Sequence, residues 1–411
     1  MFELKKFNSF QVELSTFCNV ACPLCPRHYM GTSVLLEGLR QKNITLAQWL
    51  KFLNDLDKVT TDYPINMVFC GCHGDPPMAP DWEEIIIETA KRPYIIDVET
   101  NGSMRSPESW ARVGEVFAKT EKEQSSESSI VEKVITFSID GLEDTNKLYR
   151  IGIKHDRVMA NAKAFIDAGG RARWKMIVFK HNEHQVEECK QLAKDMGFWE
   201  FDTHISTRNW EYNYAEVEKK NKKYQINYRE EENNTNKGIK IETDLRKAKK
   251  QTISSINDKD GNPVQGLYEI VGDEFEKSET KLDLNISDQG AENWKEIVAN
   301  SDLSTISCDF KESRNMYIDS EMNLWPCNYI AGTRHEDPTH MNKLIKEYGE
   351  GWNNLFEHDF RDLFKHDYFQ NVIRETWKDT SHKLCTNECQ SMCGGGIYRQ
   401  AWDTATNREE I

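Results

Sequence analysis

The chain has 411 residues, of which 38% are hydrophobic, and its formal net charge at pH 7 is −15. This length and composition suffice for a sizeable core and predict one large domain with an appendage, or two to three domains. The acidic balance argues against nucleic acid as the main partner, because affinity for a phosphate backbone comes from basic side chains. No apolar run reaches the ~18 residues of a membrane-spanning helix, so a membrane partner is not expected.

The N-terminal residues Met-Phe-Glu-Leu-Lys-Lys lack the apolar core of a secretory signal peptide. We therefore expect a cytoplasmic protein, a compartment in which thiols stay reduced. The eleven cysteines of the chain then favour metal ligation or catalysis over disulfide bonds.

Strand-like and helix-like segments alternate from residue 10 to about residue 207. Short β-rich segments predict strands at 10–17, 66–72, 93–99, 134–139, 173–179 and 202–207. Helical spacing predicts helices at 45–58, 82–91, 107–118, 157–168 and 185–196. Six strands joined by helices indicate a parallel sheet with right-handed crossovers. Because a full (β/α)8 barrel needs more units, the expected fold class is α/β with a partial, open (β/α)6 TIM-like barrel.

The remainder of the chain has a different character. Residues 212–302 are expected to be an insertion or linker, since the first half of this segment is strongly polar. Cysteines return in 303–411, where residues 317–326 predict a hairpin with its turn at 320–323. The predicted organisation is therefore a barrel in 1–211, an insertion in 212–302 and a small α+β domain in 303–411.

Three cysteines follow the first predicted strand with the spacing C-x3-C-x2-C: Cys18, Cys22 and Cys25. Three thiolates do not complete a four-ligand site, so a cubane iron–sulfur cluster held by them keeps one iron open for chemistry. A closed zinc site with His28 as the fourth ligand is one alternative, and a set of buried, inert thiols is another.

Polar clusters also follow the second, third and fourth predicted strands, in residues 71–76, 99–103 and 138–141. A parallel barrel builds its active site at these carboxyl ends of its strands. Each cluster alone is an ordinary turn signal. Three clusters in register with a cysteine triplet are not explained by turns.

Taken in order over residues 10–207, these motifs resemble the radical S-adenosylmethionine (SAM) superfamily. The matching residues are the cysteine triplet, Gly74-Asp75-Pro76 in place of the usual Gly-Glu-Pro, Thr100-Asn101-Gly, Ser138-Ile-Asp140-Gly and the later Leu-Tyr-Arg150. One position departs from the pattern, because Leu24 stands before the third cysteine where an aromatic residue is usual.

The resemblance implies that Cys18, Cys22 and Cys25 hold three irons of a [4Fe–4S] cluster and that the fourth iron chelates SAM. Reductive cleavage of SAM would give a 5′-deoxyadenosyl radical, which abstracts hydrogen from the substrate. The resemblance also implies SAM contacts, with Gly74, Asp75 and Pro76 at the amino group, Arg150 at the carboxylate, and Thr100, Asn101, Ser138 and Asp140 along the ribose and methionine.

A second group of cysteines occurs in the C-terminal region: Cys308, Cys327, Cys385, Cys389 and Cys393. It resembles the auxiliary-cluster domains of radical SAM enzymes, called SPASM in full and twitch when short. Five cysteines suffice for one auxiliary [4Fe–4S] cluster, and spacing leaves open which four are ligands. Met322 and Ile397 stand where a glycine and a cysteine are typical, which argues against a second auxiliary cluster. A structural zinc site is the alternative.

We therefore expect a radical SAM enzyme that modifies a peptide or protein side chain and receives electrons from a donor such as flavodoxin or ferredoxin. The alternative within this class is a two-electron oxidation of a small hydroxylated metabolite, in which the auxiliary cluster accepts the second electron. Outside the class, a non-enzymatic iron–sulfur or zinc protein that only binds a partner is the competing hypothesis. The other cysteines, Cys70, Cys72 and Cys189, are expected to be packed thiols.

Overall fold

A computed structural model of the chain describes residues 2–28, 35–36, 38–125, 131–179, 181–205, 308, 310, 314–336, 339–378, 382–384, 389 and 406–411. It also describes four short strands outside the main sheet: β7 (Glu216–Lys219), β8 (Lys222–Gln225), β9 (Asn227–Tyr228) and β10 (Ile239–Lys240).

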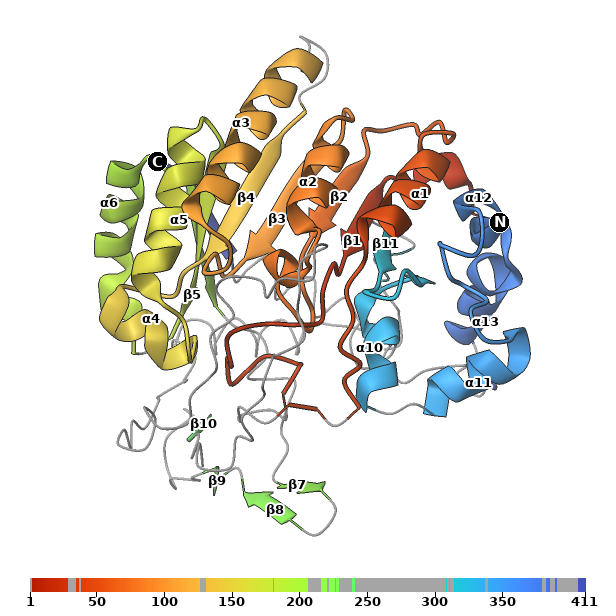
Figure 1. Cartoon of the computed structure of the whole chain (residues 1–411). Coiled ribbons are helices and arrows are strands. Elements are labelled where there is room, and N and C mark those ends of the chain that lie inside the picture. Colours follow the sequence, from red (N-terminus) through yellow and green to blue (C-terminus); the bar gives the residue numbers. More distant parts are fainter. Residues whose placement is uncertain are drawn as a thin grey trace.

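A nine-stranded sheet runs through the described part of the chain. Its central strands are parallel and lie side by side in chain order: β1 (Ser9–Val12), β2 (Asn66–Phe69), β3 (Ile95–Thr100), β4 (Lys133–Ser138), β5 (Arg171–Val178) and β6 (Glu200–Ile205). Consecutive parallel neighbours are the arrangement of a (β/α) barrel. The sheet remains open, with different strands at its two edges, so the predicted fold class is confirmed (Figure 1).

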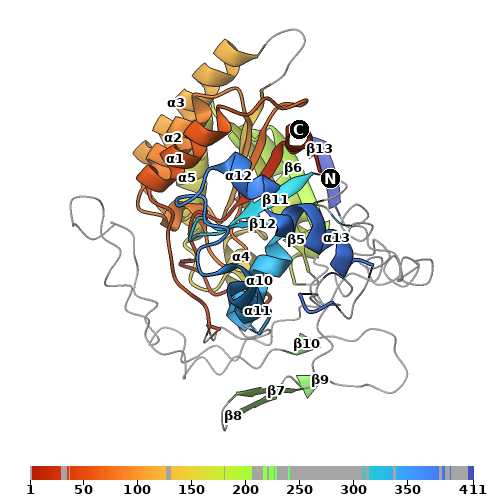
Figure 2. The same cartoon turned by 90° about the vertical axis from the view of Figure 1, so that its right-hand side faces the viewer.

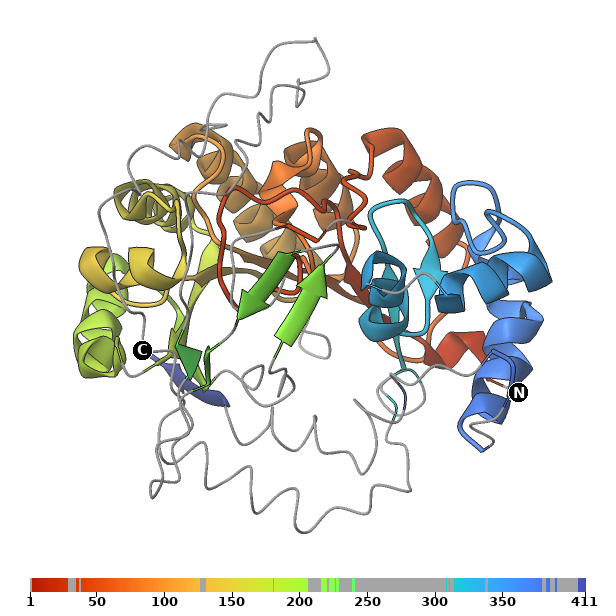
Figure 3. The same cartoon turned by 90° about the horizontal axis from the view of Figure 1, so that it is seen from below.

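Helices connect the parallel strands and cover one face of the sheet (Figures 1 and 3). They are α1 (Leu46–Leu56), α2 (Trp82–Ala90), α3 (Pro107–Gln124), α4 (Glu143–Tyr149), α5 (His155–Asp167) and α6 (Val186–Met196), with the 3₁₀ turns η1 (Leu4–Lys6), η2 (Pro76–Met78) and η3 (Glu183–Gln185). Five of these helices were predicted from their spacing. The short helix α4 was not, because its buried positions are Thr145, Asn146 and Tyr149 and carry no apolar period.

Local capping fixes the ends of the predicted helices. Thr45 and Gln48 form a capping box at the start of α1, in which each side chain binds the other residue's backbone N–H. Gly197 ends α6 with φ of 90°, a left-handed conformation that glycine adopts without steric cost. These signals explain why the sequence located both helices closely.

The two faces of the parallel strands differ in chemistry. In β3, Ile96 and Val98 are fully buried and belong to the hydrophobic core, whereas Asp97 and Glu99 alternate with them on the opposite face. Half-buried strands commonly alternate in this way, but the second face here carries charged groups that form ion pairs with β5. The polar face of the sheet is therefore the side on which a functional site has to be sought.

The C-terminal region extends the sheet beyond β1. Strand β11 (Asn315–Ile318) pairs parallel with β1 and antiparallel with β12 (Leu324–Trp325), so the predicted hairpin is confirmed. Met322 lies in its turn with φ of 66° and is completely buried. Met322 thus takes the left-handed backbone that favours glycine, while its side chain fills the core.

Helices follow this hairpin on the β11 side of the sheet (Figure 2). They are α10 (Asn328–Glu336), α11 (Thr339–Tyr348), α12 (Phe360–Lys365), a π-helical turn η6 (Tyr368–Val372) and α13 (Ile373–Thr376). Aromatic side chains from α12 and η6 join the core near the N-terminus, where the ring centroids of Phe7 and Phe364 are 4.9 Å apart.

The C-terminal strand β13 (Thr406–Glu410) pairs antiparallel with β6 at the other edge of the sheet. Residues from the predicted third segment therefore add strands to both edges of the predicted barrel. The division at 211 and 302 remains a prediction, since most of the intervening segment lies outside the described residues. Within the described ranges, no helix has the length and apolar character to cross a membrane.

Candidate active site

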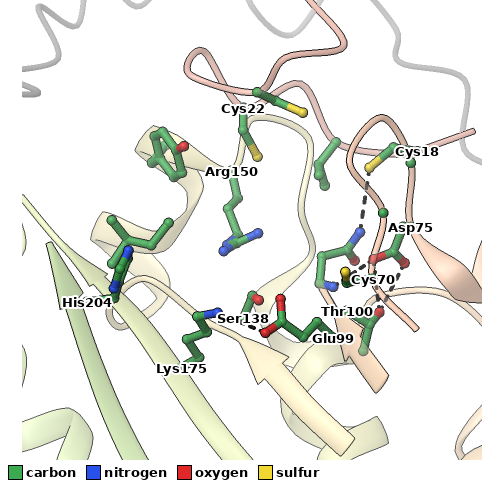
Figure 4. Close-up of a pocket in the computed structure, with 17 residues that line it drawn as sticks. Cys18, Cys22, Cys70, Asp75, Glu99, Thr100, Ser138, Arg150, Lys175 and His204 are labelled. Atoms are coloured by element: carbon green, nitrogen blue, oxygen red, sulfur yellow. Dashed lines mark hydrogen bonds and ion pairs between the residues drawn. The ribbon is translucent and has the colours of Figure 1, made fainter. Parts of the chain in front are cut away.

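A cavity of about 220 Å³ lies at the carboxyl ends of the parallel strands, between the sheet and the loop that follows β1 (Figure 4). All three cysteines of the triplet line it. It is also lined by predicted SAM-contact residues from the ends of successive strands and the end of α4, namely Gly74, Asp75, Thr100, Asn101, Ser138 and Arg150. The tertiary structure thus brings together most of the predicted site, although Pro76 and Asp140 do not line the cavity.

The loop of the cysteine triplet is held by backbone hydrogen bonds. The N–H of Cys25 donates to the carbonyl of Cys22 at 3.0 Å, and the N–H of Ala21 donates to the carbonyl of Ile151 at 2.9 Å. Burial raises the pKa of the Cys18 thiol to about 11 and raises that of Cys22 as well. Thiols in such surroundings need nearby positive charge to become the thiolates that bind metal.

Two buried arginines supply positive charge beside the triplet. Arg27 donates from Nη1 to the carbonyl of Cys18 at 2.9 Å, and its charge favours the Cys18 thiolate. Arg150 favours the thiolate of Cys22. Three thiolates with two guanidinium groups are a donor set that fits an anionic iron–sulfur cluster. Sequence reasoning overlooked Arg27, whose only signal is its place two residues after Cys25.

His28 does not line this cavity. Its Nδ1 lies 3.3 Å from the carbonyl oxygen of Cys22, and burial lowers the pKa of its ring to about 3. The neutral ring therefore contacts the loop backbone. Among the residues that the structure describes, no group of three or more His, Cys, Asp or Glu side chains is arranged to hold a single metal ion.

The carboxylate of Asp75 is held in place by its neighbours. The hydroxyl of Thr100 donates to its carboxylate at 3.0 and 3.1 Å, and the backbone N–H of Asn101 donates to Oδ1 at 2.9 Å. Burial nevertheless raises the pKa of Asp75 to about 6. The carboxylate is thus fixed in direction and suited to accept hydrogen bonds from a cationic group.

The loop before Asp75 requires glycine for a close backbone approach. A Cβ atom on Gly74 would lie 2.0 Å from the carbonyl oxygen of Ser15 and 2.7 Å from that of Phe17. The N–H of Asp75 also donates to the carbonyl of Phe17 at 2.8 Å. The loop after β2 is therefore packed directly on the backbone that leads into the cysteine triplet.

Asn101 connects the third strand end to the same loop. Its Nδ2 donates to Oδ1 of Asn19 at 3.0 Å and lies 3.9 Å from the sulfur of Cys18. Its own Oδ1 accepts from the N–H and hydroxyl of Ser103. Asn101 is thereby held in one orientation beside the first cysteine.

Asp140 lies behind Arg150, away from the cavity wall. Its Oδ2 is 2.7 Å from Nε of Arg150, and its Oδ1 accepts the N–H of Ile177 at 2.7 Å. The charge of Asp140 raises the pKa of Arg150 against the opposing effect of burial. Asp140 is therefore placed to orient Arg150, while Ser138 reaches the cavity directly.

The opposite side of the cavity is formed by side chains that were not predicted as site residues. Glu99 and Lys175 form an ion pair of 2.9 Å there, and Cys70 and His204 lie beside them (Figure 4). Gln11 donates to the sulfur of Cys70 at 3.0 Å. These side chains come from different parts of the sheet and are far apart in the sequence. The only sequence signal for them is that charged or polar residues alternate with apolar ones along the strands.

The second cysteine group is described in part. Cys308 and Cys389 are buried and Cys327 is half-buried, and all three lie near Tyr368, whose pKa they raise in addition to the larger effect of burial. Cys385, Cys393 and Ile397 lie outside the described residues. Of the expected packed thiols, Cys189 is buried in α6, whereas Cys70 lines the cavity.

Neither protein-family models nor curated protein sequences match this chain. Among solved structures, it is similar to SuiB of Streptococcus suis bound to its precursor peptide SuiA, with 17% identity, 96% of this chain and 71% of that chain covered, and a TM-score of 0.48. It is also similar to SuiB bound to S-adenosylmethionine, with 17% identity and a TM-score of 0.49. That match covers 95% of this chain and 73% of SuiB. A third similar structure is native anSMEcpe with bound AdoMet and the Kp18Cys peptide, with 13% identity and a TM-score of 0.46. That match covers 96% of this chain and 94% of anSMEcpe. Identities this low leave the assignment of function to the chemistry of the site.

Proposed function

We propose that this chain is a radical SAM enzyme. The observation that carries the proposal is the meeting of three thiols with side chains from the ends of β3 and β4, the loop after β2 and the end of α4 around one cavity. Three thiolates fit a [4Fe–4S] cluster with one open iron. A carboxylate, a guanidinium and amide groups nearby fit the amino and carboxylate groups of an amino-acid-like ligand such as SAM.

Each residue has a defined task in this proposal. Cys18, Cys22 and Cys25 hold the cluster, and Arg27 and Arg150 offset its negative charge. Asp75 accepts hydrogen bonds from the SAM ammonium group, Arg150 donates to the carboxylate, and Asn101 and Ser138 bind along the ligand. When bound, the cluster and SAM together supply the 5′-deoxyadenosyl radical that abstracts hydrogen from the substrate.

The substrate proposed first is a peptide or protein side chain. The side of the cavity that carries Glu99, Lys175 and His204 offers hydrogen-bond donors and acceptors to a polar group of that substrate. The alternative is the two-electron oxidation of a small hydroxylated metabolite, which requires a proton acceptor near the reacting carbon. Glu99 is the candidate for that acceptor because its side chain lines the cavity. The charge of Lys175 lowers the pKa of Glu99 against the effect of burial and keeps the carboxylate ionised. We further propose a cytoplasmic location and an electron donor such as flavodoxin or ferredoxin.

Anaerobic purification followed by iron and sulfide counting tests the cluster, and a 5′-deoxyadenosine assay with SAM and dithionite tests the chemistry. We expect about eight irons per chain if both cysteine groups hold clusters. Replacing Cys18, Cys22 and Cys25 together by alanine should remove about four irons and abolish 5′-deoxyadenosine formation.

The matched control is Cys189→Ala, which removes a buried thiol of α6 that does not line the cavity and should leave iron content and SAM cleavage unchanged. A colourless, zinc-loaded protein that forms no 5′-deoxyadenosine would sink the proposal and favour a non-enzymatic binding protein. The two substrate classes differ in product: a peptide gains or loses mass at a side chain, whereas a small alcohol gives a carbonyl compound.

A further inference from the structure

Arg105 has an unusual backbone conformation in the loop between β3 and α3. Its φ is 68°, in the left-handed region that residues with a Cβ atom rarely adopt. Arg157 of α5 donates from Nη2 to the carbonyl of Arg105 at 3.0 Å and so holds this conformation from outside the loop. Strained backbone persists only where the surrounding structure determines it, and it is frequent at functional sites. The conformation of Arg105 therefore calls for an explanation.

The side chain of Arg105 reaches across to the loop that follows β2. Its Nε donates to the carbonyl of Pro77 at 2.7 Å, and its Nη2 donates to the carbonyl of Ala79 and, at 3.3 Å, to that of Pro80. A guanidinium group can bind three carbonyls at once because its N–H donors form a planar fork, whereas the ammonium group of a lysine is a compact point charge. One side chain thus joins the loops after β2 and β3.

The segment that Arg105 binds follows Asp75 directly, with the sequence Pro-Pro-Met-Ala-Pro. Proline has no N–H, so only Met78 and Ala79 can donate from this backbone. Both donate within the same turn, Met78 to the carbonyl of Asp75 at 2.9 Å and Ala79 to that of Pro76 at 3.1 Å. Attachment of this backbone to a neighbouring loop is therefore left to its carbonyls, which Arg105 binds.

The same two loops are also connected at the cavity. There the carboxylate of Asp75 accepts hydrogen bonds from the hydroxyl of Thr100 and the N–H of Asn101 (Figure 4). Arg105 does not line the cavity. The loop after β2 is thus fixed twice, once by its carboxylate at the cavity and once by its carbonyls outside the cavity lining.

We propose that Arg105 is a positioning residue for Asp75. Its bonds to the three carbonyls hold the loop after β2 where Thr100 and Asn101 reach the carboxylate. This inference rests on the proposed function, in which Asp75 binds the SAM ammonium group. Arg105 acts through Asp75 and makes no contact with the ligand itself.

The test compares SAM cleavage by the wild type, Arg105→Gly and Arg314→Gly, all reconstituted anaerobically as full chains. Arg314 is the matched control, because its φ is 56° and glycine relieves the same kind of backbone strain there. Its guanidinium group lies over the exposed ring of Tyr63, 5.4 Å from the ring centroid. Formation of 5′-deoxyadenosine with dithionite is measured as a function of SAM concentration. Arg105→Lys, which keeps the charge but not the planar fork, is the milder variant.

We expect the KM for SAM to rise about tenfold in Arg105→Gly, because a small misplacement of a positioned group weakens binding. The rise should be smaller in Arg105→Lys and absent in Arg314→Gly. The kcat at saturating SAM should change little, as for a loss of ligand binding alone. A merely structural defect would instead lower kcat by reducing the fraction of folded enzyme and would leave KM unchanged.

A double-mutant cycle with Asp75→Asn tests the connection to Asp75, with SAM affinity measured by equilibrium dialysis of labelled SAM. Arg105→Gly should weaken binding little further in the Asp75→Asn background, because the group that it positions is already lost. Additive effects, or an equal KM in wild type and Arg105→Gly, would overturn the inference and leave the proposed SAM chemistry intact. A wild type that neither binds nor cleaves SAM would overturn the proposed function, and this inference with it.

Discussion

The Nε atom of Arg150 lies 2.7 Å from Oδ2 of Asp140, a carboxylate with no exposed surface. Arg150 follows α4 directly, and Asp140 is bound in turn by the N–H of Ile177, near the end of β5. The Arg150–Asp140 pair therefore connects the end of α4 to the end of β5. It also holds the guanidinium group at the wall of the proposed SAM site.

Replacing Asp140 by asparagine should be strongly destabilising. The variant keeps the shape of the side chain but leaves the buried guanidinium of Arg150 without its counter-charge, which typically costs about 3–5 kcal/mol. Denaturant unfolding of the cluster-free protein measures this loss. The control is Asp57→Asn, because Asp57 is 42% exposed in its pair with Arg92 and should cost less than about 1 kcal/mol. Equal losses in the two variants would contradict the structural role of Asp140.

The affinity for SAM should depend on the ionisation of Asp75. Burial raises the pKa of this carboxyl to about 6, whereas its ordinary value is about 4. The SAM ammonium group prefers the ionised form, so affinity should fall as the pH is lowered through about 6. Equilibrium dialysis of labelled SAM between about pH 5 and pH 8 checks this. In Asp75→Asn, SAM binding should be weak and its dependence on pH in this window should disappear.

The same pKa shift has the opposite consequence for folding. Because the folded pKa of Asp75 lies above the unfolded value, the folded state binds more protons between about pH 4 and pH 6. The contribution of Asp75 to the free energy of unfolding therefore decreases as pH rises through this window. Asp75→Asn should remove that contribution. The free energy of unfolding of the wild type and of the variant, each measured as a function of pH, checks this.

Replacing Gly74 by alanine should disrupt the proposed SAM site. The added Cβ would overlap the carbonyl oxygen of Ser15, which is backbone and lacks the freedom of a side chain. We expect a destabilisation of about 1–3 kcal/mol and a marked loss of SAM affinity. Gly332→Ala is the control, because its Cβ would meet nothing nearer than His73 Cε1 at 3.8 Å, and alanine favours the helix. Thermal unfolding and SAM binding should both distinguish the two variants.

Glu13 should contribute to SAM binding from outside the cavity. Its buried carboxylate accepts the backbone N–H of His73 at 2.6 Å and the hydroxyl of Tyr317 at 2.8 Å. It thus joins the strand before the cysteine triplet, the loop before Asp75 and strand β11. In Glu13→Gln, an amide NH₂ would face one of these donors, and a buried donor would be left unsatisfied at a cost of about 1–3 kcal/mol. We expect SAM to bind about tenfold more weakly.

A double-mutant cycle with Tyr317→Phe checks this interpretation, because residues in one hydrogen-bond network show non-additive effects of about 0.5–3 kcal/mol. Both single variants and the double variant would be compared for SAM affinity and for unfolding free energy. Strictly additive effects on SAM affinity would show that Glu13 and Tyr317 do not act through one network.

Several features of this protein follow from the sequence alone because their physical causes are local. Apolar periodicity determined the six parallel strands and five of the helices, and turn-forming residues determined the hairpin around Met322. The spacing of the cysteine triplet identified the loop after β1 as part of the candidate site, and Gly74 identified the loop after β2. In each case the signal lies within a few residues of the element that it predicts.

Other features were decided by the tertiary structure, because they depend on residues far apart in the chain. Tyr317 reaches Glu13 across 304 positions, and Lys175 reaches Glu99 across 76 positions. Pairing of β11 with β1 and of β13 with β6 places late segments at opposite edges of an early sheet. Long-range pairs of this kind leave no periodic trace in the sequence. Only the packed chain shows that buried charges have partners, and that the Tyr368 hydroxyl has none among the described residues.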